Sequence, residues 1–217
     1  MSQTETSKTQ VSRRTLAKGA AWSVPVIATA AAAPAASASV VPGQSAVSDL
    51  AYTCNAVAHT SFGDVPQGPF AWTADITATT PTSVAPGDSI PAPTITANVT
   101  TDTSSADTLR QLGVTRVTGT SAASYAVAGD VVGAGARTGS LSVPPTDVPA
   151  SGPIVTVASG PGVEETAGSG TGAITSTVGN FTVELTTTGG TIVQGLSVTC
   201  TLDTGQAADL VPSIQVK

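Results

Sequence analysis

Between residues 70 and 78, apolar and polar side chains alternate with a period of two, and this pattern constrains the fold more than any other feature of the chain. Every even position is apolar, whereas Thr73, Asp75 and Thr77 occupy odd positions. This period is typical of a half-buried antiparallel strand, because successive side chains point to opposite faces of a sheet. The sequence therefore predicts a sheet with one face in a core.

The same period recurs along the chain, in segments separated by Gly- and Pro-rich turns. Strands are predicted at residues 50–55, 95–99, 117–127, 141–143, 154–157, 173–178, 181–187 and 192–202. The pairs Gly179-Asn180 and Gly189-Gly190 are typical of two-residue hairpin turns. Short strands at this spacing predict an all-β protein, an antiparallel β-sandwich of the immunoglobulin-like type.

One segment breaks the two-residue period. Residues 103–113 begin with cap residues, continue with good helix formers and end on a glycine. This order predicts one short helix near 104–112. Its apolar residues Leu109 and Leu112 are three positions apart, so we expect them to plug one end of the sandwich.

The first 38 residues have the three parts of an export signal. A polar segment with Arg13 and Arg14 resembles the twin-arginine motif, and an Ala-rich run follows over residues 19–33. The run is shorter and less apolar than the roughly 20 residues of a stable membrane span. A small-x-small site predicts cleavage between Ala38 and Ser39. A general secretory signal and an uncleaved anchor are the alternatives.

The leader defines the expected organisation and location of the protein. We expect residues 1–38 to contact the export machinery and a signal peptidase, and residues 39–217 to form a single domain without a stable membrane span. The protein is expected to be secreted and extracellular, either released or held at the cell wall. Residues 39–217 contain four basic residues against thirteen carboxylates, a formal charge of −9. This charge excludes nucleic acid as a partner.

Two cysteines lie near the ends of this domain. Cys54 belongs to the first predicted strand and Cys200 to the last. An even number of cysteines in an exported chain predicts a disulfide, with free thiols or intermolecular pairing as alternatives. The bridge would close a loop of about 146 residues, for which loop entropy gives a stabilisation on the order of 5 kcal/mol.

The chain offers few groups for catalysis. His59 is the single histidine, so a cluster of histidines around a metal is excluded and any Ser-His-Asp triad would need this residue. Ser61 and Asp64 are close in sequence, but all three fall in a predicted loop. Sequence neighbours rarely adopt triad geometry, and no G-x-S-x-G motif is present. We interpret His59 as a solvated loop residue.

The carboxylates indicate a catalytic site no more strongly than His59 does. Glu184 falls on the outward phase of its strand, and Glu164 and Glu165 are expected to keep a loop solvated. The Gly-rich stretch 166–172 lacks the lysine and helix of a phosphate site and is interpreted as a connection between strands. We therefore expect no catalytic, cofactor-binding or metal-binding residue, no cofactor and no enzymatic activity.

Several segments together resemble a known domain. They are Tyr52-Thr-Cys54, residues 81–87, 109–120 and 148–152, and Val198-Thr-Cys200. With the leader, these segments are similar to an uncharacterised two-cysteine domain of secreted actinobacterial proteins. The resemblance implies no activity and transfers no functional residue.

Three functions are open to such a chain. The first is a cell-envelope-associated structural or interaction module that packs through its strand edges with itself or with other wall components. The second is a secreted module that binds a glycan or a protein through loops such as residues 62–69, which Phe62 and Phe70 flank. An extracellular hydrolase is the remote alternative.

Overall fold

The computed structural model describes residues 42–190 and 192–217. The predicted export motif with Arg13 and Arg14 and the predicted cleavage site at Ala38 and Ser39 lie outside these residues. The elements are β1 (Pro42–Thr60), β2 (Gly63–Pro81), β3 (Ser83–Val84), β4 (Ser89–Ile90), β5 (Thr94–Thr100), α1 (Thr103–Gln111), β6 (Val114–Gly129), β7 (Gly135–Asp147), β8 (Val155–Pro161), β9 (Glu165–Thr166), β10 (Gly172–Gly189), β11 (Val193–Leu202) and β12 (Ile214–Val216).

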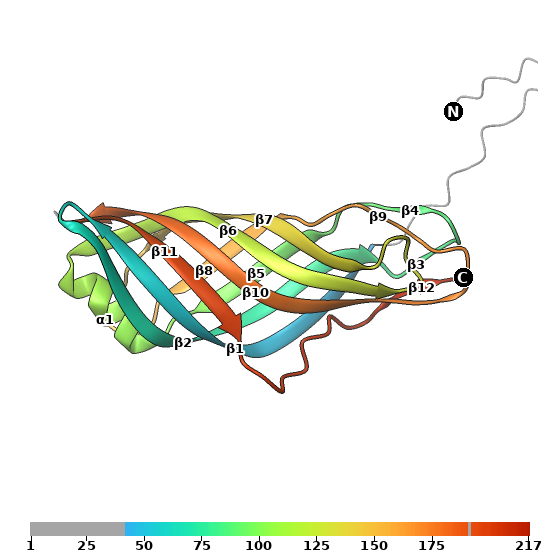
Figure 1. Ribbon diagram of the computed structural model, residues 1–217, viewed down its shortest axis with the longest axis horizontal. Helices are drawn as coiled ribbons and strands as arrows, with labels where there is room; N and C mark the ends of the chain where they lie inside the picture. The colour runs from blue at the N-terminus through green and yellow to red at the C-terminus, as the bar shows by residue number, and fades with distance from the viewer. Residues whose placement is uncertain (1–41, 191) are drawn as a thin grey trace, which may run out of the picture. The chain divides into compact units, whose positions relative to one another are not determined.

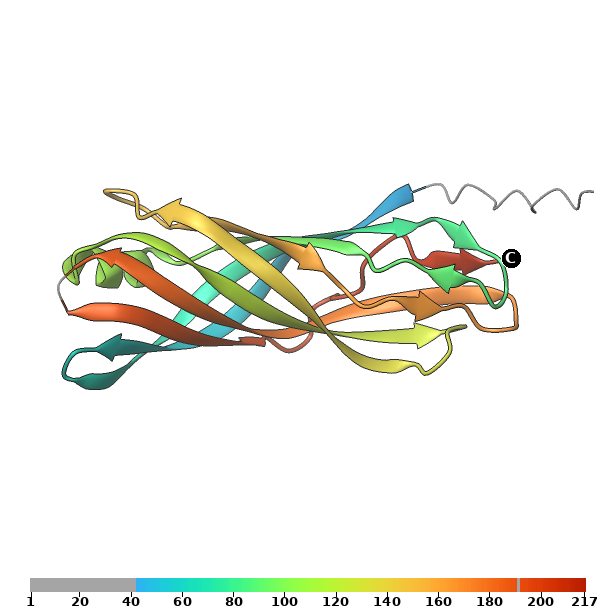
Figure 2. The ribbon, with the colours of Figure 1, turned by 90° about the horizontal axis from the view of Figure 1, so that it is seen from above.

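Ten strands form one sheet, in the order β11-β1-β2-β5-β8-β7-β6-β10-β12-β3. An additional pairing joins β11 to β10, so that the eight strands from β11 to β10 make a closed ring (Figures 1 and 2). Strands β12 and β3 extend the sheet beyond this ring and pair in parallel. Strands β4 and β9 form a separate two-stranded sheet.

The all-β class, the antiparallel pairing and the short helix are confirmed. The structure differs from the expected sandwich in one respect, because hydrogen bonds continue around the ring rather than leaving two separate sheets. The cause lies in β10, whose first residues, Gly172 to Ile174, pair with β12, whereas Phe181 to Thr186 pair with β11. One long strand thus changes partner along its length and closes the ring.

A β-bulge at Gly179 and Asn180 permits this change of partner. The pairing of β10 with β6 shifts register between Val178 and Phe181, so the predicted hairpin turn at Gly179-Asn180 is wrong. The extra residues are held from both sides, because Asn180 Oδ1 accepts a hydrogen bond from the Leu202 backbone N–H at 2.9 Å and the Ser124 hydroxyl donates to the Asn180 carbonyl. Bulges bend a strand and increase its twist.

The second predicted glycine pair does lie where the chain reverses between two antiparallel strands. The connection is longer than two residues, because β10 ends at Gly189 and β11 begins at Val193. Gly189 and Gly190 have φ angles of 78° and 70°. These positive values favour glycine, because a side chain would clash with the backbone. The two glycines end β10 at the same end of the ring as α1 (Figure 1).

Helix α1 begins at a well-formed cap. Asp102 accepts hydrogen bonds from the backbone N–H and the hydroxyl of Ser105, and also from the Ala71 backbone N–H. Partial burial opposes this charge, but the hydrogen bonds outweigh it and lower the pKa of Asp102. Leu109 and Leu112 pack against the core, as predicted.

The alternation in β2 is realised as predicted. Trp72, Ala74 and Ile76 are buried, and Thr73 and Asp75 are exposed. The other ring strands repeat this pattern, so the core lies inside the ring and consists mainly of Val, Ile, Leu and Ala. Aromatic side chains contribute at few positions.

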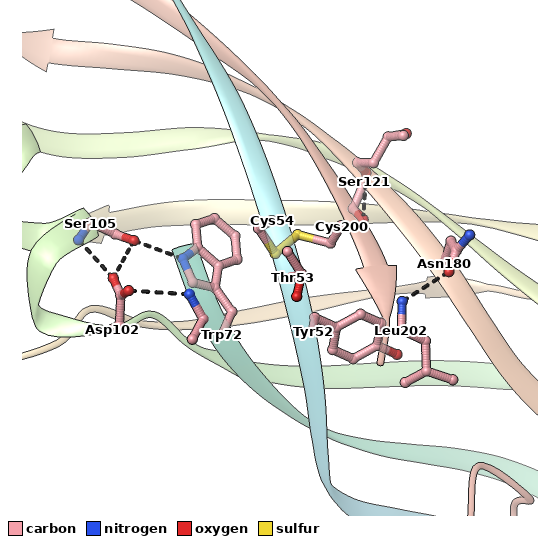
Figure 3. Close-up of a disulfide and its surroundings, with 12 residues drawn as sticks. Tyr52, Thr53, Cys54, Trp72, Asp102, Ser105, Ser121, Asn180, Cys200 and Leu202 are labelled. Carbon is pink, nitrogen blue, oxygen red and sulfur yellow. Dashed lines mark hydrogen bonds between the residues drawn. A yellow bond between two sulfur atoms is a disulfide. The ribbon is translucent and has the colours of Figure 1, made fainter. Parts of the chain in front are cut away.

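The predicted disulfide is present. Cys54 on β1 lies directly opposite Cys200 on β11, with Cα atoms 4.1 Å apart, and both residues are fully buried (Figure 3). The bridge therefore links the first strand of the ring to its last along the chain.

Candidate functional site

The inward side chains do not fill the ring. A cavity of about 80 Å³ lies among the ring strands and α1, and a second of about 60 Å³ follows it. The two cavities share six lining residues: Ile76, Ala97, Ala123, Ser124, Leu141 and Val178. Smaller cavities of about 40 Å³ and 30 Å³ adjoin the first and the second, respectively. The interior therefore holds a series of adjoining cavities.

Small side chains at inward positions account for this space. The lining of the first cavity includes Ala74, Ala97, Ala123, Ala158, Ser121 and Gly179. A closed sheet of eight strands has an interior that large side chains just fill, or that holds one small ligand. Protein interiors are otherwise packed as densely as organic crystals. Small residues at these positions therefore leave room that a large aliphatic residue would occupy.

The polar groups of the lining are engaged within the protein. The Tyr52 hydroxyl donates to the Gly179 carbonyl at 3.2 Å. Trp72 Nε1 donates to the Ser105 hydroxyl at 2.9 Å (Figure 3). The Ser121 hydroxyl donates to the Thr182 carbonyl at 2.9 Å. Among the described residues, no charged side chain lines the three cavities nearest α1. These cavities therefore suit an apolar group.

The burial of Tyr52 predicts a pH dependence of stability. Burial raises the pKa of Tyr52 from 10.0 to about 12. The unfolded chain therefore loses this proton first as pH rises, and the free energy of unfolding should fall between pH 10 and 12 by up to about 1.4 kcal/mol per pH unit. Chemical denaturation of wild type and Tyr52→Phe at pH 9, 10.5 and 12 checks this. A decline of equal size in Tyr52→Phe would contradict the assignment.

The cavity farthest from α1 has a polar border. Arg137 Nε lies 2.6 Å from Glu165 Oε1, and the pair is largely buried. A second bond of 2.9 Å joins Arg137 Nη2 to Glu165 Oε2, so the contact is bidentate. Glu165 lies in β9 and lines this cavity, and the prediction that it keeps a loop solvated is therefore wrong. Residues 167–171 connect β9 to β10, as expected for the Gly-rich stretch.

On the outer face of the ring, four polar side chains form a hydrogen-bonded series. His59 Nδ1 lies 2.8 Å from Asp64 Oδ1, and His59 Nε2 lies 2.7 Å from Ser197 Oγ. The Ser197 hydroxyl donates to Glu184 Oε2 at 2.5 Å. His59 belongs to β1, so the prediction of a loop is wrong. Its serine partner is Ser197 on β11 rather than the neighbouring Ser61.

This series has the distances of a Ser-His-Asp triad but not its hydrogen-bond direction. In a triad the serine hydroxyl donates to the histidine, which removes the proton during attack. Here the Ser197 hydroxyl donates to Glu184 Oε2 instead of to His59. The series instead cross-links four adjacent strands by charge-assisted hydrogen bonds.

Two further findings concern the part of the chain that the structure describes. Residues 42–190 and 192–217 contain no helix whose length and apolar character would let it cross a membrane. Within the same residues, no group of three or more His, Cys, Asp or Glu side chains is arranged to hold a metal ion.

The closed ring and its cavities place the protein among all-β proteins in which an antiparallel sheet surrounds an apolar interior. The chain belongs to a family of unknown function, DUF6801, whose model matches residues 51–211. The match includes both cysteines and every strand of the ring, apart from the part of β1 that precedes residue 51. The resemblance to an uncharacterised domain is thereby confirmed, whereas the actinobacterial origin and the leader stay predictions. No curated protein and no solved structure matches the chain.

Proposed function

We propose that the protein is an exported, non-enzymatic binding module of the cell envelope or the medium, and that it holds the hydrocarbon chain of an amphiphilic ligand inside its ring. The observation that carries this proposal is the series of adjoining apolar cavities lined by small side chains. The disulfide and the predicted leader support an extracellular location, because disulfides persist in oxidising compartments.

The size and lining of the cavities favour a single alkyl chain. The two larger cavities together approach the roughly 150 Å³ that holds benzene in a cavity engineered in another protein. They adjoin one another through shared residues, so a narrow ligand can extend from one into the next. With no charged side chain beside these two cavities among the described residues, the polar head of the ligand would remain outside.

The expected affinity follows from the buried hydrocarbon. Each buried CH₂ group contributes about 0.8 kcal/mol, so about six of them, as many carbons as benzene has, contribute about 5 kcal/mol. This free energy corresponds to a Kd on the order of 0.2 mM. Such an affinity suits a protein that takes up and releases a lipid-like molecule.

The other candidate functions have less support. Assembly through strand edges would have little open edge to use, because the sheet ends at the two-residue strand β3 and every ring strand pairs on both sides, β7 and β8 through a single residue pair. The segment at residues 62–69 is predicted as a loop, but β2 begins at Gly63 and makes most of this segment a strand. Hydrolysis by His59 would require the serine proton that Glu184 accepts.

Quenching of Trp72 fluorescence by 9,10-dibromostearate tests the proposal. Trp72 lines the first and third cavities, and it is the single tryptophan of residues 39–217. In the exported chain purified from producing cells, we expect saturable quenching with a Kd on the order of 0.2 mM. Quenching requires the bromine atoms to lie close to the indole, so it reports an interior ligand.

The variant Ala97→Leu should weaken this binding at least tenfold. Ala97 is buried and lines both larger cavities, so a leucine fills space that the ligand needs. The matched control is Ala126→Leu, which makes the same change at an exposed position of β6. Thermal unfolding verifies that both variants fold. Absence of saturable quenching, or equal weakening in both variants, would overturn the proposal.

A further inference from the structure

Three large apolar side chains are exposed at the end of the ring where α1 lies. Phe62, in the turn between β1 and β2, is 87% exposed, Val65 is 43% exposed and Ile192, beside the start of β11, is 42% exposed. The Ser61 backbone N–H donates to the Ile192 carbonyl at 3.2 Å, which joins the two turns. Figure 1 shows the β1–β2 turn and the start of β11 at the end that carries α1. We call these three residues the apolar tip.

The third cavity lies toward the same end of the ring as the apolar tip, because residues of α1 line it. Its half-buried lining residues include Gln67 and Phe70 of β2, and Leu112, which follows α1. Gln67 follows Val65 by two residues on the same strand. Leu109 lines both the third cavity and the first, so these two cavities adjoin at this side chain.

We infer that the apolar tip docks on a zwitterionic lipid surface and that the hydrocarbon chain enters the ring beside it, below α1. This inference rests on the proposed function, because it names the place where that ligand enters. Clustered exposed apolar side chains mark interaction sites. A phenylalanine on a projecting turn inserts readily into a fluid apolar phase, whereas a protein partner would need a matching hollow.

The charge of the chain selects the kind of lipid. Residues 39–217 carry a formal charge of −9, which repels anionic membranes. Near the tip, Asp64 is paired with His59, and Glu184 accepts a hydrogen bond from Ser197. At the same end of the ring, two basic side chains are neutralised by carboxylates. Arg110 is paired with Asp107, and Arg116 is paired with Asp147. Phosphatidylcholine is therefore the expected partner, and phosphatidylglycerol should weaken docking.

Vesicle flotation tests the inference. The exported chain is mixed with phosphatidylcholine vesicles, or with vesicles containing phosphatidylglycerol in addition. The tip variant Phe62→Ser/Ile192→Ser should lose at least tenfold in partitioning to phosphatidylcholine. The matched control, Val132→Ser/Val211→Ser, removes two apolar side chains that are 61% and 63% exposed at positions outside the tip, and it should partition like wild type.

Each other outcome overturns the inference. No partitioning of wild type, an equal loss in the control variant, or partitioning that requires phosphatidylglycerol would each do so. Dimerisation of wild type that the tip variant abolishes would assign the tip to a second copy of the chain. Dibromostearate quenching in the tip variant without vesicles separates the two proposals. Retained quenching with no docking refutes the docking alone, whereas loss of quenching in wild type refutes the proposed function.

Discussion

Replacing Cys54 and Cys200 together by alanine is expected to lower the free energy of unfolding by about 3 to 5 kcal/mol. The bridge closes a loop with a sequence separation of 146 residues, so its loss frees a large amount of conformational entropy in the unfolded chain. It also links β1 to β11, where the ring joins the two ends of the chain. Urea denaturation of the oxidised wild type and of the variant measures the difference.

Reduced wild type is the control for this experiment. Reduced wild type retains both sulfur atoms in the core. Its loss in the free energy of unfolding, relative to oxidised wild type, therefore measures the contribution of the cross-link. Any further loss in the alanine variant measures the packing contribution of the sulfur atoms. The intact mass of protein recovered from producing cells should correspond to a chain that begins at Ser39 and is two hydrogens lighter than the reduced sequence. A loss below 1 kcal/mol on reduction would show that the ring is stable without the bridge.

Changing Gly160 to alanine is expected to destabilise the protein by about 3 kcal/mol. A Cβ atom on Gly160 would lie 2.1 Å from the Ser140 carbonyl oxygen, which belongs to the neighbouring strand. Between β7 and β8 the ladder contains one residue pair, Ser142 with Ser159, so the backbones here have few hydrogen bonds to hold them while they adjust. The same urea experiment gives the difference in free energy.

Gly172→Ala is the matched control. A Cβ atom at Gly172 would meet its nearest neighbour, Asp130 Cβ, at 3.6 Å, an ordinary contact distance. Its backbone conformation also suits an alanine, so we expect a change below about 0.5 kcal/mol. If Gly160→Ala were equally mild, the close approach of β7 and β8 would not be required for ring closure.

The elements of this fold could be predicted from the sequence because their signals are local. The alternation of apolar and polar residues in β2 indicates which face of that strand is buried, and the capping residue Asp102 indicates where the helix starts. The glycine pairs were harder to interpret. At Gly189-Gly190 the chain reverses between β10 and β11 as expected, whereas at Gly179-Asn180 the same kind of signal belongs to a bulge. The difference depends on Leu202 and Ser124, which are distant in sequence.

The candidate site could not be predicted, because a cavity is a volume that side chains leave empty. Alanines such as Ala74 and Ala97 would pack well between two flat sheets, and their small size leaves space only where the sheet curves into a ring. Ser197 was missed for a related reason. It meets His59 across neighbouring strands that are 138 residues apart in sequence. One indication of this contact was present in the sequence: Glu184 falls at a position of its strand that faces outward, and Ser197, its partner on the neighbouring strand, faces the same way.

The pairing of β1 with β11 determines when this protein can finish folding. Tyr52 pairs with Leu202, so a chain emerging from the ribosome lacks the closing strand until nearly all of it has been made. Until then the apolar inner faces remain open to water and to other chains, and such long-range pairing forms slowly. A leader that delays export until folding is complete would therefore protect the cell from an aggregation-prone intermediate. Truncation before β11 should yield an insoluble chain rather than a smaller functional one.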